Sequence, residues 1–212
     1  MKQGFMVDPS KLDQNAGFLC LSSHWRPNPN DPDPDMPGQK LTMTSYIPMR
    51  ADDICLCGSG RMYNVCCRQE RYWRPVCLNP DGKGYSLLAP QSATFHRVNG
   101  TTLRGYLMKD KHLYCVDAGT KSSFWIYWGD PALEDQYGIL CFGDIELKRN
   151  RTLLVTAMSD LRMQTLLKLL KEITGDELSE PYIAHDRMQM IDKRGSRTKD
   201  AIRRHRPIKP DR

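Results

Sequence analysis

The stretch TLLVTAMSDLRMQTLLKLLKEITG, residues 152–175, decides the fold class. It begins with β-forming residues over 152–158 and continues into an amphipathic helix. Ser159 suits the N-cap of this helix, Asp160 its first turn and Gly175 the position after its end. Apolar residues recur at helical period at Met163, Leu166, Leu167, Leu170 and Ile173. We therefore expect a strand followed by a helix whose apolar face packs on a sheet.

Further strands are expected upstream of this pair. Two turns are predicted between them: a hairpin turn at Asn99-Gly100 and a polar turn over 148–151. The expected strands are short runs rich in β-forming residues, at 85–88, 93–98, 103–108, 112–117, 122–128 and 139–147. The sequence thus predicts an α+β fold in which an antiparallel β-sheet is packed with a C-terminal helix.

The most aromatic run, SSFWIYW at 122–128, allows two interpretations. Strand alternation puts Trp125 and Tyr127 on one face, and the opposite face receives Phe124, Ile126 and Trp128. One set belongs to the core, and the other either offers a platform for stacking or protein contact, or is buried as well. Burial on both faces is the interpretation that we favour.

Four cysteines fall within 13 residues, in the pattern C-x-C-x8-C-C. The two glycines around Ser59 let the chain reverse between the cysteine pairs, and we expect Tyr63 to pack on the site. The second pair is expected at the start of a helical turn. Four thiolates complete a tetrahedral metal shell and leave no open position, so such a site is structural rather than catalytic. The candidate ligands are Cys55, Cys57, Cys66 and Cys67.

The segment CLCGSGRMYNVCC resembles the SEC-C motif, commonly CPCGSGKKYKKCC, over about residues 53–70. That motif occurs at the C-terminal tail of the SecA translocation ATPase and in many small bacterial proteins. The resemblance implies that the four cysteines bind Zn²⁺, and that the module contacts a chaperone or ribosomal partner. The sequence departs from the common motif at Leu56, Arg61 and Asn64, none of which is a ligand.

Three other interpretations of the cluster stay open at this point. The cysteines can be free thiols of a reduced protein, or thiols with a redox function. Four thiolates also suit iron, and zinc is preferred because of the resemblance. Clustered cysteines without an export signal favour a metal over disulfides.

Charge and composition divide the remainder of the chain. The net charge is +6, while residues 1–185 hold 21 Lys/Arg and 21 Asp/Glu, so the excess lies in the tail. We predict an N-terminal segment with a Pro-rich linker at 1–49, a SEC-C-like zinc module at 50–72, a sheet-and-helix domain at 73–185 and a basic, disordered tail at 186–212.

The tail is the second functional signal, because basic segments bind RNA, DNA or acidic protein surfaces through charge. Its candidate partner-binding residues are Arg203, Arg204, Arg206 and Lys209. The function expected first is a zinc-binding adaptor that contacts a protein or ribonucleoprotein. One alternative is a nuclease or hydrolase with its site in 85–185, and another is a regulatory or inhibitor protein of a larger complex.

Candidate catalytic residues are scattered along the sequence. His185-Asp186 has the composition of an acid–base pair, although no partner nucleophile is identifiable. No run approaches the roughly 20 apolar residues of a membrane helix, and mean hydropathy is −0.58. The N-terminus lacks the apolar region of a secretory signal, so a cytoplasmic location is the default expectation.

Overall fold

The computed structural model describes residues 17–26, 39–133, 139–186 and 191–192. Its fold is α+β, as the sequence predicts. The Pro-rich stretch 27–38 and the tail residues 193–212 lie outside the described residues, and so do Arg203, Arg204, Arg206 and Lys209.

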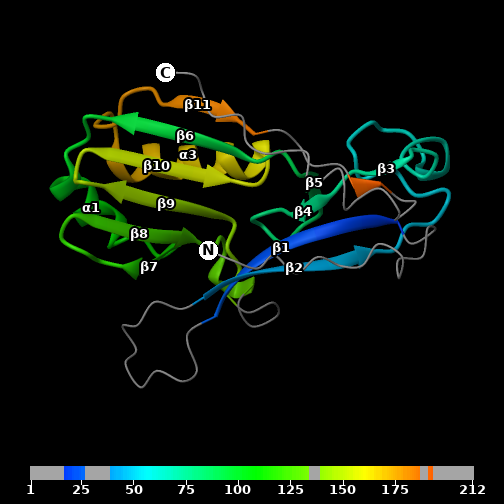
Figure 1. The fold of residues 1–212 in the computed structure, drawn as a ribbon, viewed down its shortest axis with the longest axis horizontal. Coiled ribbons are helices and arrows are strands. Elements are labelled where there is room, and N and C mark those ends of the chain that lie inside the picture. Colours follow the sequence, from blue (N-terminus) through cyan, green and yellow to red (C-terminus); the bar gives the residue numbers. More distant parts are fainter. Residues whose placement is uncertain (1–16, 27–38, 134–138, 187–190, 193–212) are drawn as a thin grey trace.

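The larger sheet has six strands in the order β11-β6-β10-β9-β8-β7, and all of its neighbours are antiparallel (Figure 1). The expected turn at 148–151 joins β9 to β10. These strands are β6 (Gln91–His96), β7 (Leu113–Asp117), β8 (Ser122–Tyr127), β9 (Gly143–Lys148), β10 (Thr152–Ala157) and β11 (Tyr182–His185).

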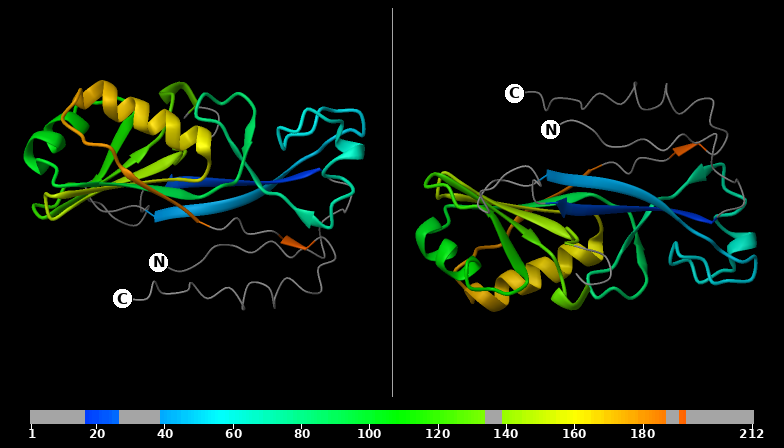
Figure 2. Two further views of the ribbon diagram at one scale, coloured as in Figure 1. Left: turned by 90° about the horizontal axis from the view of Figure 1, so that it is seen from above. Right: turned by 90° about the horizontal axis from the view of Figure 1, so that it is seen from below.

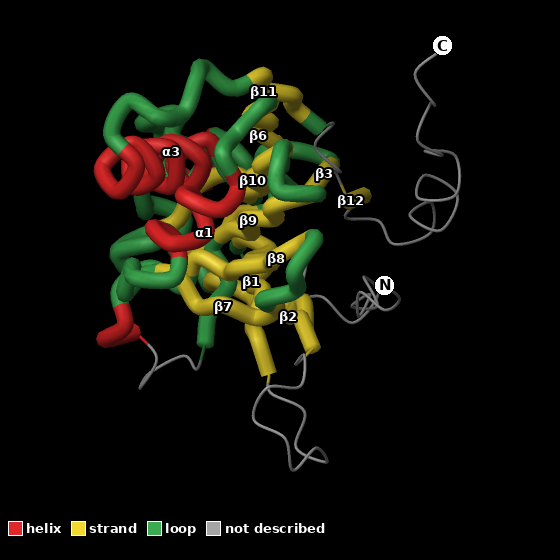
Figure 3. The backbone as a smooth tube through the Cα atoms, turned by 90° about the vertical axis from the view of Figure 1, so that its left-hand side faces the viewer, coloured by secondary structure: helices red, strands yellow, loops and turns green. Residues whose placement is uncertain are grey.

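Both α-helices lie on one face of this sheet (Figures 2 and 3). Helix α3 (Asp160–Thr174) begins after Ser159, whose side chain accepts a hydrogen bond from the Arg162 N–H, and ends before Gly175, as predicted. Its Met163, Leu166 and Leu170 are buried against the inward-facing residues of the strands. The apolar stripe read from the sequence is therefore the contact between helix and sheet.

The prediction for 99–108 is wrong. Asn99-Gly100 is not a hairpin turn, and residues 103–108 are not a strand, because helix α1 (Gly100–Leu107) begins here. The Asn99 side chain accepts a hydrogen bond from the Thr102 N–H, which caps the helix. Leu103 and Leu107, spaced by four, are buried under the sheet. The same dipeptide suits both a tight turn and an N-cap, and the spacing of the leucines decides for the helix.

The aromatic run is buried on the inner face of the sheet but only partly on the outer face, where Phe124 and Trp128 keep intermediate exposure, so the burial on both faces favoured from the sequence is wrong in part. Trp125 and Tyr127 belong to the core under α3, and Ile126 on the opposite face is fully buried. The strand expected over 139–147 begins only at Gly143, since Leu140 forms an isolated bridge with His24.

A second sheet, in the order β2-β1-β4-β5, involves the N-terminal segment. Strands β1 (Phe18–Arg26) and β2 (Gln39–Ile47) pair along nine residues, and β1 also pairs in parallel with β4 (Val76–Leu78). Strand β5 (Tyr85–Leu87) completes the sheet. Neither β1 nor β2 is expected from the sequence analysis. The segment 1–49 thus supplies half of the strands of a sheet.

The β1–β2 hairpin covers one end of the outer face of the six-stranded sheet, away from the helices. Lys40 Nζ lies 2.6 Å from Asp144 Oδ2, and the Cys141 N–H donates to the Ser23 carbonyl at 2.7 Å. Arg162 of α3 joins the two sheets on the other side, where its Nε donates to the Leu78 carbonyl at 3.0 Å.

The remaining elements are short. They are the 3-10 turns η2 (Tyr63–Val65) and η3 (Pro131–Leu133), and the two-stranded pair β3 (Tyr72–Trp73) with β12 (Ile191–Asp192). Among the described residues, no helix combines the length and apolar character needed to span a membrane.

Candidate metal centre

The cysteine-rich loop is folded by hydrogen bonds between its two arms. The Cys55 N–H donates to the Arg61 carbonyl and the Tyr63 N–H to the Asp53 carbonyl, both at 2.8 Å. Between the arms, Gly58 and Gly60 have φ of 78° and 71°, a conformation that glycine adopts without strain. The chain reversal expected at this point is confirmed, and it brings the first cysteine pair over the second.

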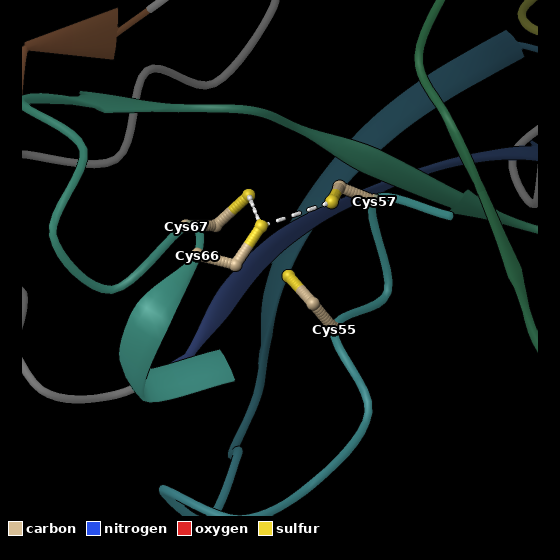
Figure 4. Close-up of side chains that lie close together, drawn as sticks. All are labelled: Cys55, Cys57, Cys66 and Cys67. Atoms are coloured by element: carbon tan, nitrogen blue, oxygen red, sulfur yellow. Dashed lines mark hydrogen bonds between the residues drawn. The ribbon is translucent and has the colours of Figure 1, made fainter. Parts of the chain in front are cut away.

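The four cysteine side chains point toward one another (Figure 4). Their sulfur atoms all lie within 4.8 Å of one another. The Sγ atoms of Cys57 and Cys66 are 3.5 Å apart, and those of Cys66 and Cys67 are 4.0 Å apart. A tetrahedral shell with metal–sulfur bonds of about 2.3 Å has sulfur–sulfur edges of about 3.8 Å. The two measured distances bracket this value, so the four thiols can hold one metal ion.

Cys66 and Cys67 follow the turn η2 rather than beginning a helical turn as expected. The Cys66 N–H donates to the Tyr63 carbonyl at 3.1 Å, which closes the turn. The Arg68 N–H donates to the same carbonyl at 3.2 Å. Successive residues at the end of a turn can both point inward, and this explains how adjacent cysteines reach one site.

Polar groups around the sulfurs favour negative charge at one of them. The Ser59 hydroxyl lies 3.2 Å from Cys66 Sγ and Arg61 Nη2 lies 3.5 Å from it. The hydrogen bond from Ser59 lowers the pKa of the Cys66 thiol to about 6. Burial raises the pKa of Cys55 and of Cys67, so these thiols keep their protons unless a cation offsets the charge. A divalent metal supplies that charge and displaces the protons.

Tyr63 ties the loop to the second sheet. Its side chain is 1% exposed, its hydroxyl donates to the Gly17 carbonyl at 3.1 Å, and its ring lies 5.6 Å from that of Phe18. The expected packing of Tyr63 on the site is thus confirmed. The apolar cluster that contains the cysteines also includes Cys20 and Val76, from β1 and β4. The loop and the sheet therefore share one small core.

Three large apolar side chains of the same loop face solvent. Ile54 is 63% exposed, Met62 51% and Val65 53%. Ile54 and Met62 lie opposite each other in an isolated antiparallel bridge. The loop thus places sulfur atoms inside and apolar side chains outside, the reverse of the usual distribution in a small domain.

Two histidines, His112 and His185, lie outside the cysteine-rich loop. His112 Nδ1 lies 3.1 Å from Asp110 Oδ1. His112 and Tyr127 are among the residues that line a hollow of about 430 Å³. The Asp110 carboxylate accepts the His112 backbone N–H as well, as in an ordinary Asx turn. His185 lies on the edge strand β11.

Sequence reasoning missed two contributions to the site. It did not assign Ser59 a role at Cys66, although a hydroxyl between two glycines is visible in the sequence. It also did not single out the exposed apolar residues. Their signal was position, since Ile54 directly precedes a ligand, and Met62 and Val65 lie between ligands that must point inward. None of the family models, curated proteins or solved structures compared with this chain matches it.

Proposed function

We propose that residues 50–72 form a structural zinc module of the SEC-C type, and that the module presents a surface to a protein or ribonucleoprotein partner. The observation that carries the proposal is the four-sulfur cluster, whose spacing suits one tetrahedral ion. The ligands would be Cys55, Cys57, Cys66 and Cys67. When bound, the ion would supply a rigid cross-link between the two arms of the loop.

The chemistry of the donor set supports a structural role. Four thiolates fill the shell of a tetrahedral ion, so no position is left for a substrate or a water molecule. The surroundings also suit a thiolate cluster, because Arg61 approaches Cys66 and the N–H groups of Cys57 and Cys67 reach Cys55 Sγ. Such outer contacts orient ligands and offset the negative charge of the cluster.

The exposed side chains support a binding role. A loop that exposes Ile54, Met62 and Val65 loses free energy in water unless another surface covers them. A cross-linked loop can hold these residues in place without help from a large core, which lowers the entropy lost on binding. We therefore assign the contact with the partner to this trio.

Metal content of the purified full-length protein tests the first half of the proposal. We expect about one zinc per chain, and none in the Cys66→Ser/Cys67→Ser double variant. Cys115→Ser is the matched control, because Cys115 is a partly buried cysteine of β7 far from the cluster in the sequence, and it should leave the zinc in place. Visible absorption bands would show iron instead. A native protein prepared without chelators that holds no metal would refute the site.

The proposed contact with a partner is tested separately. Ile54→Ser/Met62→Ser/Val65→Ser should keep its zinc, since none of the three is a ligand, and should lose the complexes that the native protein forms in cells. Leu161→Ser is the control, because Leu161 is also exposed, at 42%, but lies on α3. If both variants keep the same complexes, the trio is not the contact surface.

A further inference from the structure

Among the residues that the structure describes, only one end of the outer face of the six-stranded sheet is covered. The β1–β2 hairpin lies over the end that contains Ile126 and Asp144. Toward the other end, the register aligns one row of side chains across five strands, namely Phe124, Glu146, Leu154, Thr94 and Tyr182. None of these five is buried, and Tyr182 is 70% exposed. No described helix packs on this face (Figures 1 and 2).

Two aromatic rings lie at the ends of this row. Phe124 on β8 and Tyr182 on β11 are separated by four strand spacings, roughly 19 Å. A short single strand of nucleic acid can span that distance with its bases stacked on the rings. Between the two rings lie the short side chain of Thr94 and the half-buried side chain of Leu154.

Three loops at the same end of the sheet concentrate positive charge. The Val98 N–H donates to the Arg151 carbonyl at 3.0 Å, and the Gly100 N–H to the Asn150 carbonyl at 3.2 Å. Arg104 Nη2 joins the third loop, because it donates to the Gly119 carbonyl at 3.1 Å. The segments 96–104, 117–122 and 146–152 together hold six Lys/Arg and two Asp/Glu, although residues 1–185 as a whole are neutral. The six are Arg97, Arg104, Lys121, Lys148, Arg149 and Arg151.

Two of these arginines have an unusual backbone. Arg97 has φ of 59° and Arg149 of 51°, the left-handed region in which a side chain costs about 1 kcal/mol or more. Arg149 is the first residue of the three-residue loop between Lys148 and Thr152, at a positive φ that Asn or Gly adopts more readily. An arginine at each of these positions is not explained by turn chemistry alone.

We propose that this open half of the outer face binds single-stranded nucleic acid. The cationic loops contact the phosphates, and the rings of Phe124 and Tyr182 stack on bases. Three acidic residues, Asp117, Glu146 and Glu177, lie at the same end and reduce its charge. Glu146 lies 3.0 Å from Lys148, and Glu177 shares with His96 and Arg97 a hollow of about 750 Å³ beside β6. The inference goes beyond the proposed zinc module, because it rests on the six-stranded sheet and the loops at its end.

Single strands suit this surface better than a duplex. A sheet face with accessible rings offers base-stacking positions that only unpaired bases can occupy, as in other sheet-based readers of RNA. Protein partners with acidic surfaces would use the charge but not the rings. Removal of a ring should therefore weaken the binding of single-stranded nucleic acid but not that of an acidic protein partner.

Fluorescence anisotropy on the full-length protein tests the proposal, with a labelled oligouridine of about 12 nucleotides and the corresponding DNA and duplex. We expect Arg149→Glu/Arg151→Glu to weaken binding about tenfold or more at about 50 mM salt, and to reduce the salt slope by about 1.4. Lys168→Glu/Lys171→Glu on α3 is the matched control, since it makes the same change in charge on the opposite face, and it should weaken binding less than about threefold.

Removal of the ring separates nucleic acid from other polyanions. Tyr182→Ala should weaken oligouridine binding about tenfold while binding of polyglutamate stays unchanged, because stacking requires a base. Circular dichroism and thermal melting establish that each variant folds. The proposal is overturned if native protein does not bind single strands, if the two double variants weaken binding equally, or if polyglutamate competes as well as RNA. Equal effects of the double variants would mean that binding follows the overall charge of the protein rather than this face.

Discussion

The cysteine-rich loop and the six-stranded sheet differ in what fills their interiors. The sheet and α3 bury a continuous set of apolar side chains, many of them fully inaccessible to solvent. The loop places four sulfur atoms inside and leaves Ile54, Met62 and Val65 outside. A segment of about 20 residues has too few apolar contacts to hold itself in one conformation, so the proposed metal cross-link at its centre would do what a core does elsewhere.

Metal removal should separate the two regions most strongly. With the metal chelated, we expect amide hydrogen exchange over residues 54–67 to accelerate about a hundredfold or more, because the small core that the loop shares with the second sheet is too small to hold it alone. Exchange in β9 and β10, which rest on the apolar core, should change little. Mass spectrometry of peptic fragments measures both regions in one sample. Equal acceleration in both would mean that they unfold together.

A large effect is also expected at the junction between the two sheets. Arg162 is 2% exposed, its guanidinium lies 4.9 Å from the Phe142 ring centroid, and it donates to the Leu78 carbonyl. Arg162→Ala removes this packing and leaves a buried carbonyl without a donor, so the free energy of unfolding should fall by about 3 kcal/mol.

Urea unfolding of the Arg162→Ala protein in its metal-bound form measures this change. Lys168→Ala is the control, because the Lys168 side chain is 79% exposed, and its effect should stay within about 0.5 kcal/mol. A loss as small as that of the control would show that the two sheets do not depend on Arg162 for their contact.

A smaller effect is expected at the contact between the loop and β1. Tyr63→Phe removes the hydroxyl that donates to the Gly17 carbonyl, and should lower the free energy of unfolding by about 1 kcal/mol. Tyr182→Phe, at an exposed position, should have no measurable effect on stability. If Tyr63→Phe is also without effect, the shared core is held by its apolar contacts alone.

The smallest expected effect is a change in the pKa of the Cys66 thiol. The hydroxyl of Ser59 stabilises the thiolate of Cys66, so Ser59→Ala should raise the pKa of that thiol from about 6 by about one pH unit. In the metal-free protein, the rate of Cys66 alkylation by iodoacetamide, followed by peptide mass, should then reach half its maximum at a higher pH. Ser22→Ala, in β1, is the control. An unchanged midpoint would mean that neighbouring thiols, not Ser59, set the pKa.

The sequence predicts best those parts of the fold in which short-range chemistry and packing agree. The helix after Ser159 carries a cap, an apolar stripe and a terminal glycine, and the structure places all three as expected. The cysteine cluster is similar, because its ligand spacing and its glycines act within one loop. The prediction for residues 99–108 fails for the opposite reason. Asn99 can begin either a turn or a helix, and only the tertiary position of Leu103 decides between the two.

Long-range pairing explains the strands that the sequence analysis missed. Strand β2 contains Thr, Tyr and Ile at β-forming density, yet its partners are β1, across a Pro-rich stretch, and Asp144, which Lys40 contacts from 104 residues away. No local pattern encodes such a pairing. The open half of the sheet face was likewise beyond the sequence, because it depends on how far the hairpin extends over the strands.

The separation of Lys40 and Asp144 along the sequence has a consequence for folding during synthesis on the ribosome. A ribosome adds about 5–20 residues each second, so the hairpin made first waits roughly 5–20 s before the strand it will cover exists. During that interval the part of the hairpin that carries Lys40 has no native surface to rest on, whereas Phe18 meets its partner Tyr63 earlier. The N-terminal strands are therefore the part of the chain for which a nascent-chain chaperone has the longest opportunity.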